Sequence, residues 1–136
     1  MFLVDTNVVS ELIRPRPHLP VVRRLLSIDP ALLFASEITR YELRFGAAIH
    51  PRSQDIWSRV ESEILPLPTW LPVDEDVSLA TADLCALLRK SGKPIEMPDA
   101  LLAATARVHD LVLVTRNVRH FQNVPALAVE NWFSGE

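Results

Sequence analysis

Cysteine is nearly absent from this sequence of 136 residues, which contains only Cys85. A single cysteine can form neither an internal disulfide nor a zinc site built from several thiolates. This usage is typical of a reducing compartment, so we expect a cytoplasmic protein. Long apolar runs are also missing, because none approaches the roughly 20 residues that a membrane-spanning helix needs. We therefore expect no membrane partner.

Glycine and lysine are scarce as well, with 3 and 2 residues. Hydrophobic residues nevertheless make up 49% of the chain and charged residues 23%, which is ordinary for a globular protein and excludes a fibrous or disordered one. A chain of this length can bury a substantial core. We expect one domain that covers residues 1–136.

Arginine supplies 12 of the 14 basic residues, although the net charge is -3. Its planar guanidinium donates two parallel hydrogen bonds to phosphate, but a coding bias explains the excess equally well. The positions of the arginines along the sequence must therefore distinguish these two explanations. Eight of the arginines gather in three groups, which are Arg14, Arg16, Arg23 and Arg24, then Arg40 and Arg44, then Arg116 and Arg119. One face can thus be basic, and we expect Arg44 and Arg116 to bind substrate.

Apolar periodicity and turn residues predict strands that alternate with helices. The expected strands are 2–5, 31–35, 69–73, 111–114 and 127–129, and the expected helices are 7–13, 20–27, 37–49, 53–65, 75–90 and 98–108. Ser36 is a good N-cap and Gly92 a good C-terminal stop. The alternation predicts an α/β protein, a single α/β/α sandwich around a central, mostly parallel sheet.

Three carboxylates occupy unusual positions in this pattern. Asp5 follows the first strand, at the edge of the sheet where ligands bind in open α/β folds. Asp99 lies in the first turn of a helix that is apolar nearly all round, and either residue can instead be a helix cap. The sequence alone leaves both explanations open.

Glu42 lies within the expected apolar stripe of its helix, which consists of Ile38, Tyr41, Phe45, Ala48 and Ile49. A glutamate in such a stripe faces inward, where an unpaired charge costs several kcal/mol. We therefore expect Glu42 to be protonated, to pair with an arginine at a helix interface or to bind a metal.

Four segments together resemble the PIN-domain ribonucleases, most closely the VapC or FitB-like toxins of bacterial toxin-antitoxin pairs. The segments are MFLVDTN at 1–7, SEIT at 36–39 with Glu42 after it, PDALLAATA at 98–106 and LVTRNVRHF at 113–121. The resemblance spans almost the whole chain and implies a PIN-like sandwich, an acidic Mg²⁺ or Mn²⁺ site and endonucleolytic cleavage of RNA. It also implies a cognate antitoxin protein and a homodimer.

By position, the resemblance makes Asp5, Glu42 and Asp99 the metal ligands and the acidic catalytic core. Asn117 stands where many members carry a fourth acid, and its carbonyl oxygen can accept a hydrogen bond but brings no charge. Glu96 is a candidate for the missing charge and His120 for a general acid. The simpler interpretations are a solvated loop acid and a structural histidine.

The expected chemistry follows from charge repulsion. Two carboxylates about 4 Å apart repel by roughly 4 kcal/mol at an effective dielectric constant of 20, so three need a cation. Oxygen ligands select Mg²⁺ or Mn²⁺, and a metal-bound water can attack phosphorus. Thr6, Asn7 and Thr115 are expected to support the ligands by hydrogen bonds.

Three alternatives remain to be weighed against the nuclease. A response-regulator receiver needs an acidic pair after its first strand, and a haloacid-dehalogenase-type phosphatase needs a second aspartate at Asn7. Neither pattern is present. The stronger alternative is a non-cleaving PIN-fold module that binds RNA or a protein partner, because Asn117 weakens the metal site.

Overall fold

The computed structural model describes residues 1–134, and its five strands form one sheet. The strand order is β3-β2-β1-β4-β5, and all four neighbouring pairs are parallel. The strands are β1 (Phe2–Val4), β2 (Leu33–Ser36), β3 (Thr69–Leu71), β4 (Val112–Val114) and β5 (Val129–Glu130). The expected α/β class is confirmed, and the sheet is parallel in every pairing within residues 1–134.

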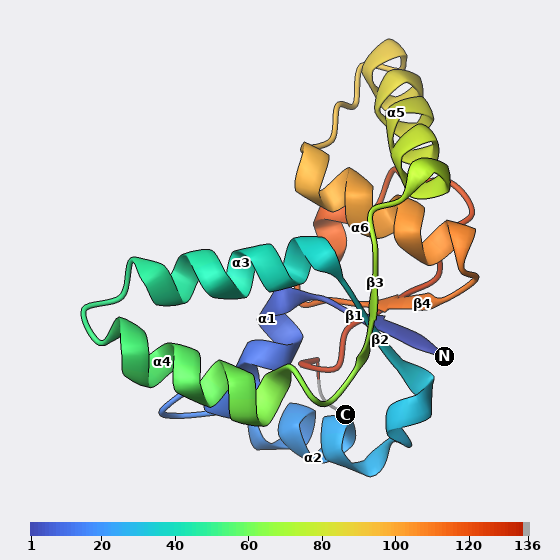
Figure 1. Cartoon of the computed structure of the whole chain (residues 1–136). Coiled ribbons are helices and arrows are strands. Elements are labelled where there is room, and N and C mark those ends of the chain that lie inside the picture. Colours follow the sequence, from blue (N-terminus) through green and yellow to red (C-terminus); the bar gives the residue numbers. More distant parts are fainter. Residues whose placement is uncertain (135–136) are drawn as a thin grey trace.

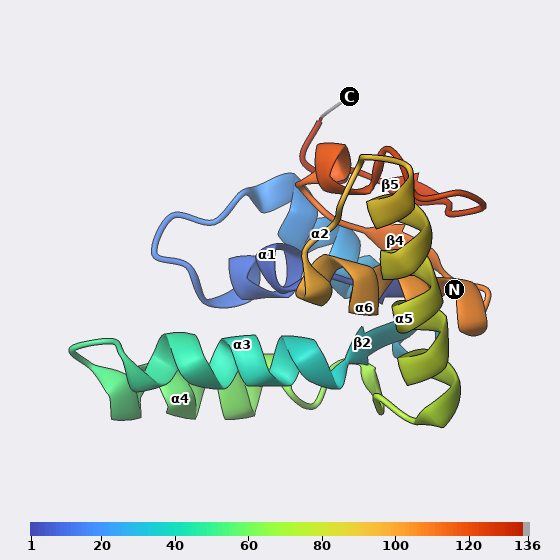
Figure 2. The ribbon, with the colours of Figure 1, turned by 90° about the horizontal axis from the view of Figure 1, so that it is seen from above.

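Helices connect the strands and cover both faces of the sheet (Figure 1). They are α1 (Thr6–Val9), α2 (Leu19–Ser27), α3 (Glu37–Ala48), α4 (Ser53–Arg59), α5 (Glu75–Lys90) and α6 (Met97–Val108). Helices α5 and α6 lie on one side of the sheet and α2 on the other (Figure 1). Helices α3 and α4 project together from one end (Figure 2). No helix within residues 1–134 is long and apolar enough to cross a membrane.

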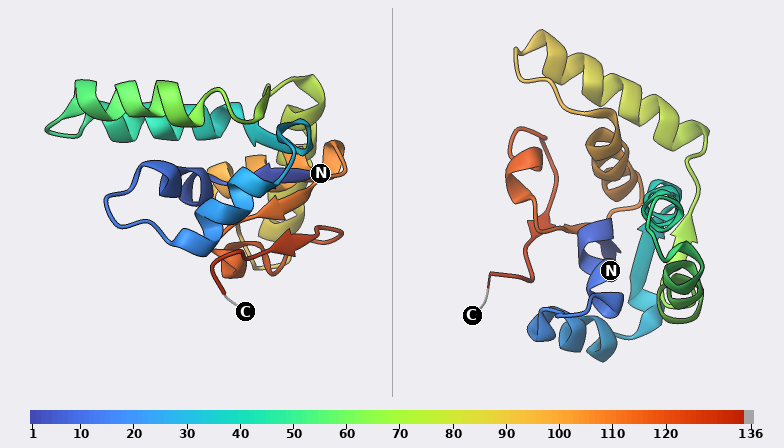
Figure 3. Two further views of the ribbon diagram at one scale, coloured as in Figure 1. Left: turned by 90° about the horizontal axis from the view of Figure 1, so that it is seen from below. Right: turned by 90° about the vertical axis from the view of Figure 1, so that its left-hand side faces the viewer.

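Each face of the sheet has its own hydrophobic core, because side chains alternate along the strands. Val4 and Val114 pack with α2 and the segment after α4, whereas Leu3 and Leu113 pack with α5 and α6. The two layers of helices lie on opposite sides of the strands in Figure 3. The result is the expected sandwich of helices, sheet and helices.

The helix starts follow the local signals in the sequence. The Ser36 hydroxyl accepts a hydrogen bond from the Ile38 N–H at 3.1 Å, and the Asp74 carboxylate accepts one from the Val77 N–H at 3.0 Å. These caps satisfy N–H groups that have no partner inside the helix. At the end of α5, Ser91 is the C-cap, and Gly92 follows it with a φ of 73° that glycine adopts without strain.

Several predicted boundaries were wrong by a few residues. The strand predicted at 31–35 begins only at Leu33, because Pro30–Leu32 forms a 3₁₀ turn in which Asp29 accepts the Ala31 N–H at 3.0 Å. The predicted helix 7–13 is α1 followed by a 3₁₀ segment, Ser10–Ile13. The predicted helix 53–65 is α4 followed by a π-helical segment, Val60–Ile64.

The predicted buried stripe of α3 was wrong at four of its five positions, and only Ile38 is half-buried against the core. Tyr41, Phe45 and Ile49 are 61%, 53% and 69% exposed, whereas Leu43 and Ala47 pack into the core. Much of α3 projects beyond the sheet with α4 packed along it, so Tyr41, Phe45 and Ile49 are left uncovered (Figure 1). Glu42 lies between the two faces and is half-buried.

Candidate active site

The carboxyl ends of the parallel strands define one edge of the sheet, and the candidate site lies at this edge. Asp5 follows β1, and its N–H donates to the Val114 carbonyl at 2.9 Å. Thr115 follows β4 next to it. A pocket of about 420 Å³ opens here, lined by Asp5, Thr6, Asn7, Glu42, Glu96, Pro98, Asp99, Leu102, Asn117 and His120. The structure therefore brings the three predicted acids to one pocket.

Asp5 accepts more hydrogen bonds than Glu42 or Asp99. It is only 7% exposed, and its Oδ1 accepts the Thr6 N–H at 2.7 Å, as an N-cap of α1. Its Oδ2 accepts the Thr115 hydroxyl at 2.8 Å and the Asn7 side-chain amide at 3.3 Å. Asp5 is thus both a helix cap and part of the pocket, so the two interpretations of this residue are compatible.

Glu42 reaches the pocket from α3. Its Oε1 accepts a hydrogen bond from the Thr6 hydroxyl at 2.5 Å, which joins α3 to the residue after Asp5. Only a side chain with a hydroxyl group, such as threonine or serine, can donate this hydrogen bond from position 6. The contact with Glu42 therefore explains why threonine follows Asp5.

Asp99 reaches the pocket from the first turn of α6, where the helix dipole favours a negative charge. One of its oxygens, Oδ2, lies 3.1 Å from Nδ1 of His120. His120 is therefore placed beside an acid of the pocket rather than on a remote turn.

No arginine or lysine within residues 1–134 forms an ion pair with Asp5, Glu42 or Asp99. Burial raises the pKa of the Asp5 carboxyl above its ordinary value, because it penalises the charged form. Hydrogen bonds from Thr115 and the Thr6 N–H lower that pKa, while the charges of Glu42 and Asp99 raise it. The pocket is thus a region of negative charge that protein cations do not neutralise.

A hard divalent cation suits this set of side chains, although the site is not closed around one. Among the described residues, no group of three His, Cys, Asp or Glu side chains is arranged as a ready metal cage. Glu42 is directed to Thr6 and Asp99 to His120. The carboxylate oxygens and the unrelieved repulsion fit an ion that keeps several waters as ligands, and they do not fit a tightly enclosed zinc.

The remaining predicted residues are placed as follows. Asn117 lines the pocket, and its N–H donates to the Thr115 hydroxyl at 3.1 Å. Glu96 also lines it. The Arg44 guanidinium lies over the Trp57 ring at 4.8 Å and is not among the residues that line the pocket. Arg116 lies over the Phe133 ring at 4.8 Å, in a neighbouring hollow.

Sequence reasoning missed one charged residue of this region, Glu11. It is only 3% exposed, and its carboxylate accepts the His18 N–H at 2.7 Å and pairs with Arg14 at 3.4 Å. No signal near Glu11 in the sequence marks it as buried, because its partner His18 is brought close only by the turn of the chain.

The protein is therefore an α/β protein with a pocket lined by carboxylates at the carboxyl edge of its parallel sheet. The model of the PIN domain family matches residues 2–127. The toxin FitB of Neisseria gonorrhoeae is 36% identical over 97% of this chain and 99% of its own length. The VapC ribonuclease Y4jK of Sinorhizobium fredii is also 36% identical, over 97% and 98%.

A solved structure gives the same result. The crystal structure of FitAcB from Neisseria gonorrhoeae contains a chain that superposes with a TM-score of 0.90 at 36% identity, covering 99% of this chain and 100% of the other. The present chain therefore belongs to the PIN domain family, among the relatives of the VapC and FitB toxins. The resemblance read from its four motifs is confirmed. Nucleases of this family generally depend on a metal.

Proposed function

We propose that this chain is a metal-dependent endoribonuclease that acts as the toxin of a toxin-antitoxin pair. The observation that carries the proposal is the pocket in which Asp5, Glu42 and Asp99 meet without an arginine partner in the described chain. The membership in the PIN family and the ribonuclease and toxin names of its relatives support it. One nuclease domain over residues 1–136 is part of the proposal.

The proposed metal is Mg²⁺ or Mn²⁺, held by Asp5 and Asp99, with Glu42 as a ligand through water or as the base that orients the attacking water. The all-oxygen carboxylate set supports this choice over softer metals. When bound, such an ion supplies charge stabilisation at the scissile phosphate and acidifies a water.

The other residues of the pocket have positioning roles in this proposal. Thr115 and Asn7 fix the Asp5 carboxylate, and Thr6 fixes the Glu42 carboxylate. The Asn117 side-chain oxygen can accept a hydrogen bond from a water or a ribose hydroxyl, and, unlike a fourth acid, it does not repel the RNA phosphates. The network holds the carboxylates in place before the substrate arrives, which reduces the reorganisation needed for reaction.

A nuclease assay tests the proposal. Purified wild-type protein should cleave single-stranded RNA when Mn²⁺ or Mg²⁺ is added and stop when the metal is chelated. Asp5→Asn should abolish cleavage, whereas the matched control Asp83→Asn, at an exposed position of α5, should keep it.

The alternative function, a PIN-fold module that binds RNA or a partner without cutting, is supported by Asn117 and by the open arrangement of the acids in the described chain. The same assay separates the two. RNA that stays intact with every divalent metal, while the wild type still binds it, would leave only the binding role.

A cognate antitoxin is the proposed protein partner. The exposed stripe of Tyr41, Phe45 and Ile49 supports it, because these apolar side chains lie on α3, the helix that also carries Glu42, and exposed apolar patches are typical of interaction sites. Growth arrest on expression of the chain alone, relieved by co-expression of the antitoxin gene, is the expected result.

A homodimer and a cytoplasmic location are also proposed. Light scattering after size-exclusion chromatography tests whether the protein is a dimer.

A further inference from the structure

A second hollow, which we call the arginine pocket, lies next to the acidic one and has the opposite charge. Its walls include Glu11, Arg14, Arg16, His18, Arg116 and Phe133, and its volume is about 260 Å³. Three guanidinium groups against one carboxylate give it a positive charge in a protein whose net charge is -3. Neither the proposed metal site nor the proposed partner surface uses it.

The backbone holds two of these arginines in a restricted conformation. Arg14 and Arg16 each precede a proline, which disfavours helical backbone angles and keeps the chain extended. Arg14 has φ -72° and ψ 144°, as this rule predicts. Since Pro15 and Pro17 also fix their own φ angles, binding by this segment orders less chain than binding by a flexible basic loop.

The buried carboxylate of Glu11 closes this segment. It binds the N–H of His18 at one end of the loop and the side chain of Arg14 at the other. A carboxylate that is 3% exposed would be costly without such partners. Glu11 therefore keeps the loop at the wall of the pocket, while the Arg14 side chain remains largely exposed to solvent.

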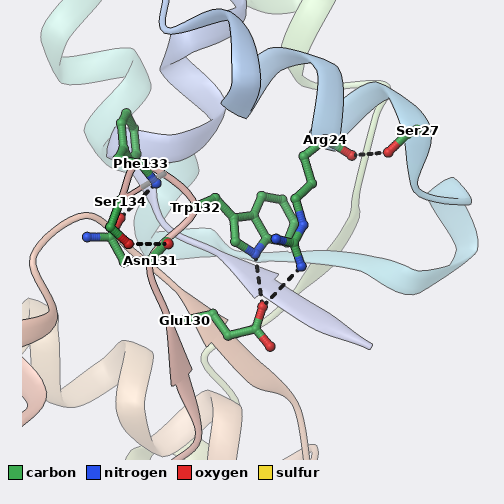
Figure 4. A network of polar contacts seen from close by, with 7 residues as sticks. All are labelled: Arg24, Ser27, Glu130, Asn131, Trp132, Phe133 and Ser134. Atoms are coloured by element: carbon green, nitrogen blue, oxygen red, sulfur yellow. Dashed lines mark hydrogen bonds and ion pairs between the residues drawn. The ribbon is translucent and has the colours of Figure 1, made fainter. Parts of the chain in front are cut away.

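Phe133 forms the opposite wall and is itself fixed. Its N–H donates to the Asn131 side chain at 2.8 Å, while neighbouring Trp132 donates to Glu130 at 3.0 Å, and the rings of Phe133 and Trp132 point in different directions (Figure 4). The ring of Phe133 contacts His18 at 5.3 Å between centroids and Arg116 at 4.8 Å. Arg116 is thus a flat cationic plane held on an aromatic ring.

The arginine pocket is continuous with the acidic pocket. Arg116 also lines an intermediate hollow with Arg119, and that hollow shares Asn117 and His120 with the acidic pocket. In addition, the Arg116 N–H donates to the Asn7 side chain at 3.1 Å, and Asn7 binds Asp5. A chain-like ligand bound along the acidic pocket would therefore contact these arginines next.

We propose that the arginine pocket binds a phosphate of single-stranded RNA beside the scissile bond, with the adjacent base stacked on the Arg116 plane. This inference rests on the proposed function, because it assigns a binding site to the part of the RNA substrate that flanks the scissile bond. Arg14 and Arg16 supply hydrogen bonds to the phosphate, and Arg116 supplies the plane. The site offsets the repulsion between the RNA backbone and the three carboxylates.

RNA fits this surface better than an acidic peptide does. A guanidinium supported on an aromatic ring offers a flat stacking face, which bases use and aspartate or glutamate side chains do not. The arginine pocket also connects to the acidic pocket through the intermediate hollow. A nucleic-acid strand is long enough to occupy both pockets at once.

Binding of RNA by an inactive protein tests the proposal apart from cleavage. In an Asp5→Asn background without metal, the double substitution Arg14→Gln and Arg16→Gln is compared with Arg89→Gln and Arg107→Gln, at exposed positions in the last turns of α5 and α6. The probe is a fluorescein-labelled single-stranded RNA of mixed sequence, about 12 nucleotides long. Anisotropy is measured over a series of salt concentrations, and circular dichroism verifies folding.

The Arg14 and Arg16 pair should weaken binding by about tenfold and make the dependence of log K on log salt concentration shallower by roughly 0.7 per lost phosphate contact. The control pair should leave both values unchanged. Phe133→Leu should weaken binding without changing the salt dependence, because it removes the support of the stacking plane and no charge.

Three results would overturn the inference. The first is equal RNA binding by the two arginine pairs, and the second is no RNA binding by the Asp5→Asn parent at low salt. The third is unchanged RNA binding together with weaker binding of an oligoglutamate peptide, which would make the pocket a site for acidic protein. Metal-dependent cleavage by the wild type is read separately, so a failure here is distinguishable from a failure of the nuclease proposal.

Discussion

The acidic pocket and the arginine pocket adjoin along the same edge of the sheet, yet the protein holds their charges in opposite ways. The acids are bound by hydroxyl groups and a histidine, so their negative charge is left uncompensated by arginine in the described chain. The arginine pocket has its own buried counter-ion, Glu11, and an aromatic support. The difference fits the proposed roles, because a bound cation would neutralise the first pocket, whereas protein groups already stabilise the charges of the second.

The largest expected effect is on cleavage, from Asp99→Asn. Loss of one carboxylate of the acidic pocket removes several kcal/mol of stabilisation by the metal, so the rate of RNA cleavage should fall at least about a hundredfold. Fold stability should change little, because the amide oxygen of the asparagine can still accept a hydrogen bond from Nδ1 of His120, and the loss of one negative charge relieves repulsion with Asp5. Single-turnover assays measure the rate, and activity within about twofold of wild type would contradict a role for Asp99 as ligand.

The next effect is on stability, from Glu11→Ala. This change leaves the His18 N–H without its acceptor and should lower the free energy of unfolding by about 1–3 kcal/mol in urea titrations. Glu11→Gln is the matched control, because its amide oxygen still accepts that N–H. Equal losses in the two variants would show that the charge, and not the hydrogen bond to His18, anchors the loop.

A smaller effect is expected from Thr6→Val, which removes the hydroxyl that binds Glu42 but keeps the shape of the side chain. A hydrogen bond to a charged group contributes about 1.5–3 kcal/mol, so kcat should fall about tenfold or more while KM changes little. Thr6→Ser should restore most of the activity. A change confined to KM would instead place Thr6 in substrate binding.

The smallest expected effect is the pH dependence of stability that Asp5 causes. Because burial raises the pKa of Asp5 in the folded state, the folded protein keeps this proton to a higher pH than the unfolded chain does. Its contribution to stability is complete below the unfolded value and is lost as the pH rises through the raised folded value. Asp5→Asn should therefore raise Tm at neutral pH without metal.

Two measurements check this last expectation. Thermal unfolding from pH 3 upward should show the advantage of Asp5→Asn shrinking toward the acid end, where Asp5 is protonated in both states. Addition of Mn²⁺ at neutral pH should raise the Tm of the wild type more than that of Asp5→Asn. A lower Tm of Asp5→Asn at every pH would mean that its hydrogen bonds outweigh its buried charge.

Much of the fold was predictable because local signals and global packing agree. The helix α6 is an example, since Pro98 and Asp99 mark its start and its apolar residues on every side correspond to real burial. The helix α3 shows where such reasoning fails. Tyr41, Phe45 and Ile49 face outward because α3 extends past the sheet, whereas Leu43, Ala47 and Ile38 near the start of the helix meet the core.

The candidate site was predictable in part for a similar reason. Asp5 follows a strand, so its place at the carboxyl edge of the sheet could be inferred from the chain alone. Its contact with Thr115, 110 residues further along, and the link between Thr6 and Glu42 depend on which strands and helices become neighbours. Nothing in the local sequence predicted that Glu11 would be buried or that Arg44 would cover Trp57.

By itself, the sequence determined the kinds of side chain available: two acids at the ends of regular elements, a third within a helix, a surplus of arginine and two arginine-proline pairs. Their order and spacing were sufficient to indicate the family. The tertiary structure decided which of these charges meet, because the strand order β3-β2-β1-β4-β5 brings the ends of β1 and β4 together and leaves α3 at the side. Long-range contacts of this kind arise from packing the whole sheet, and no short segment encodes them.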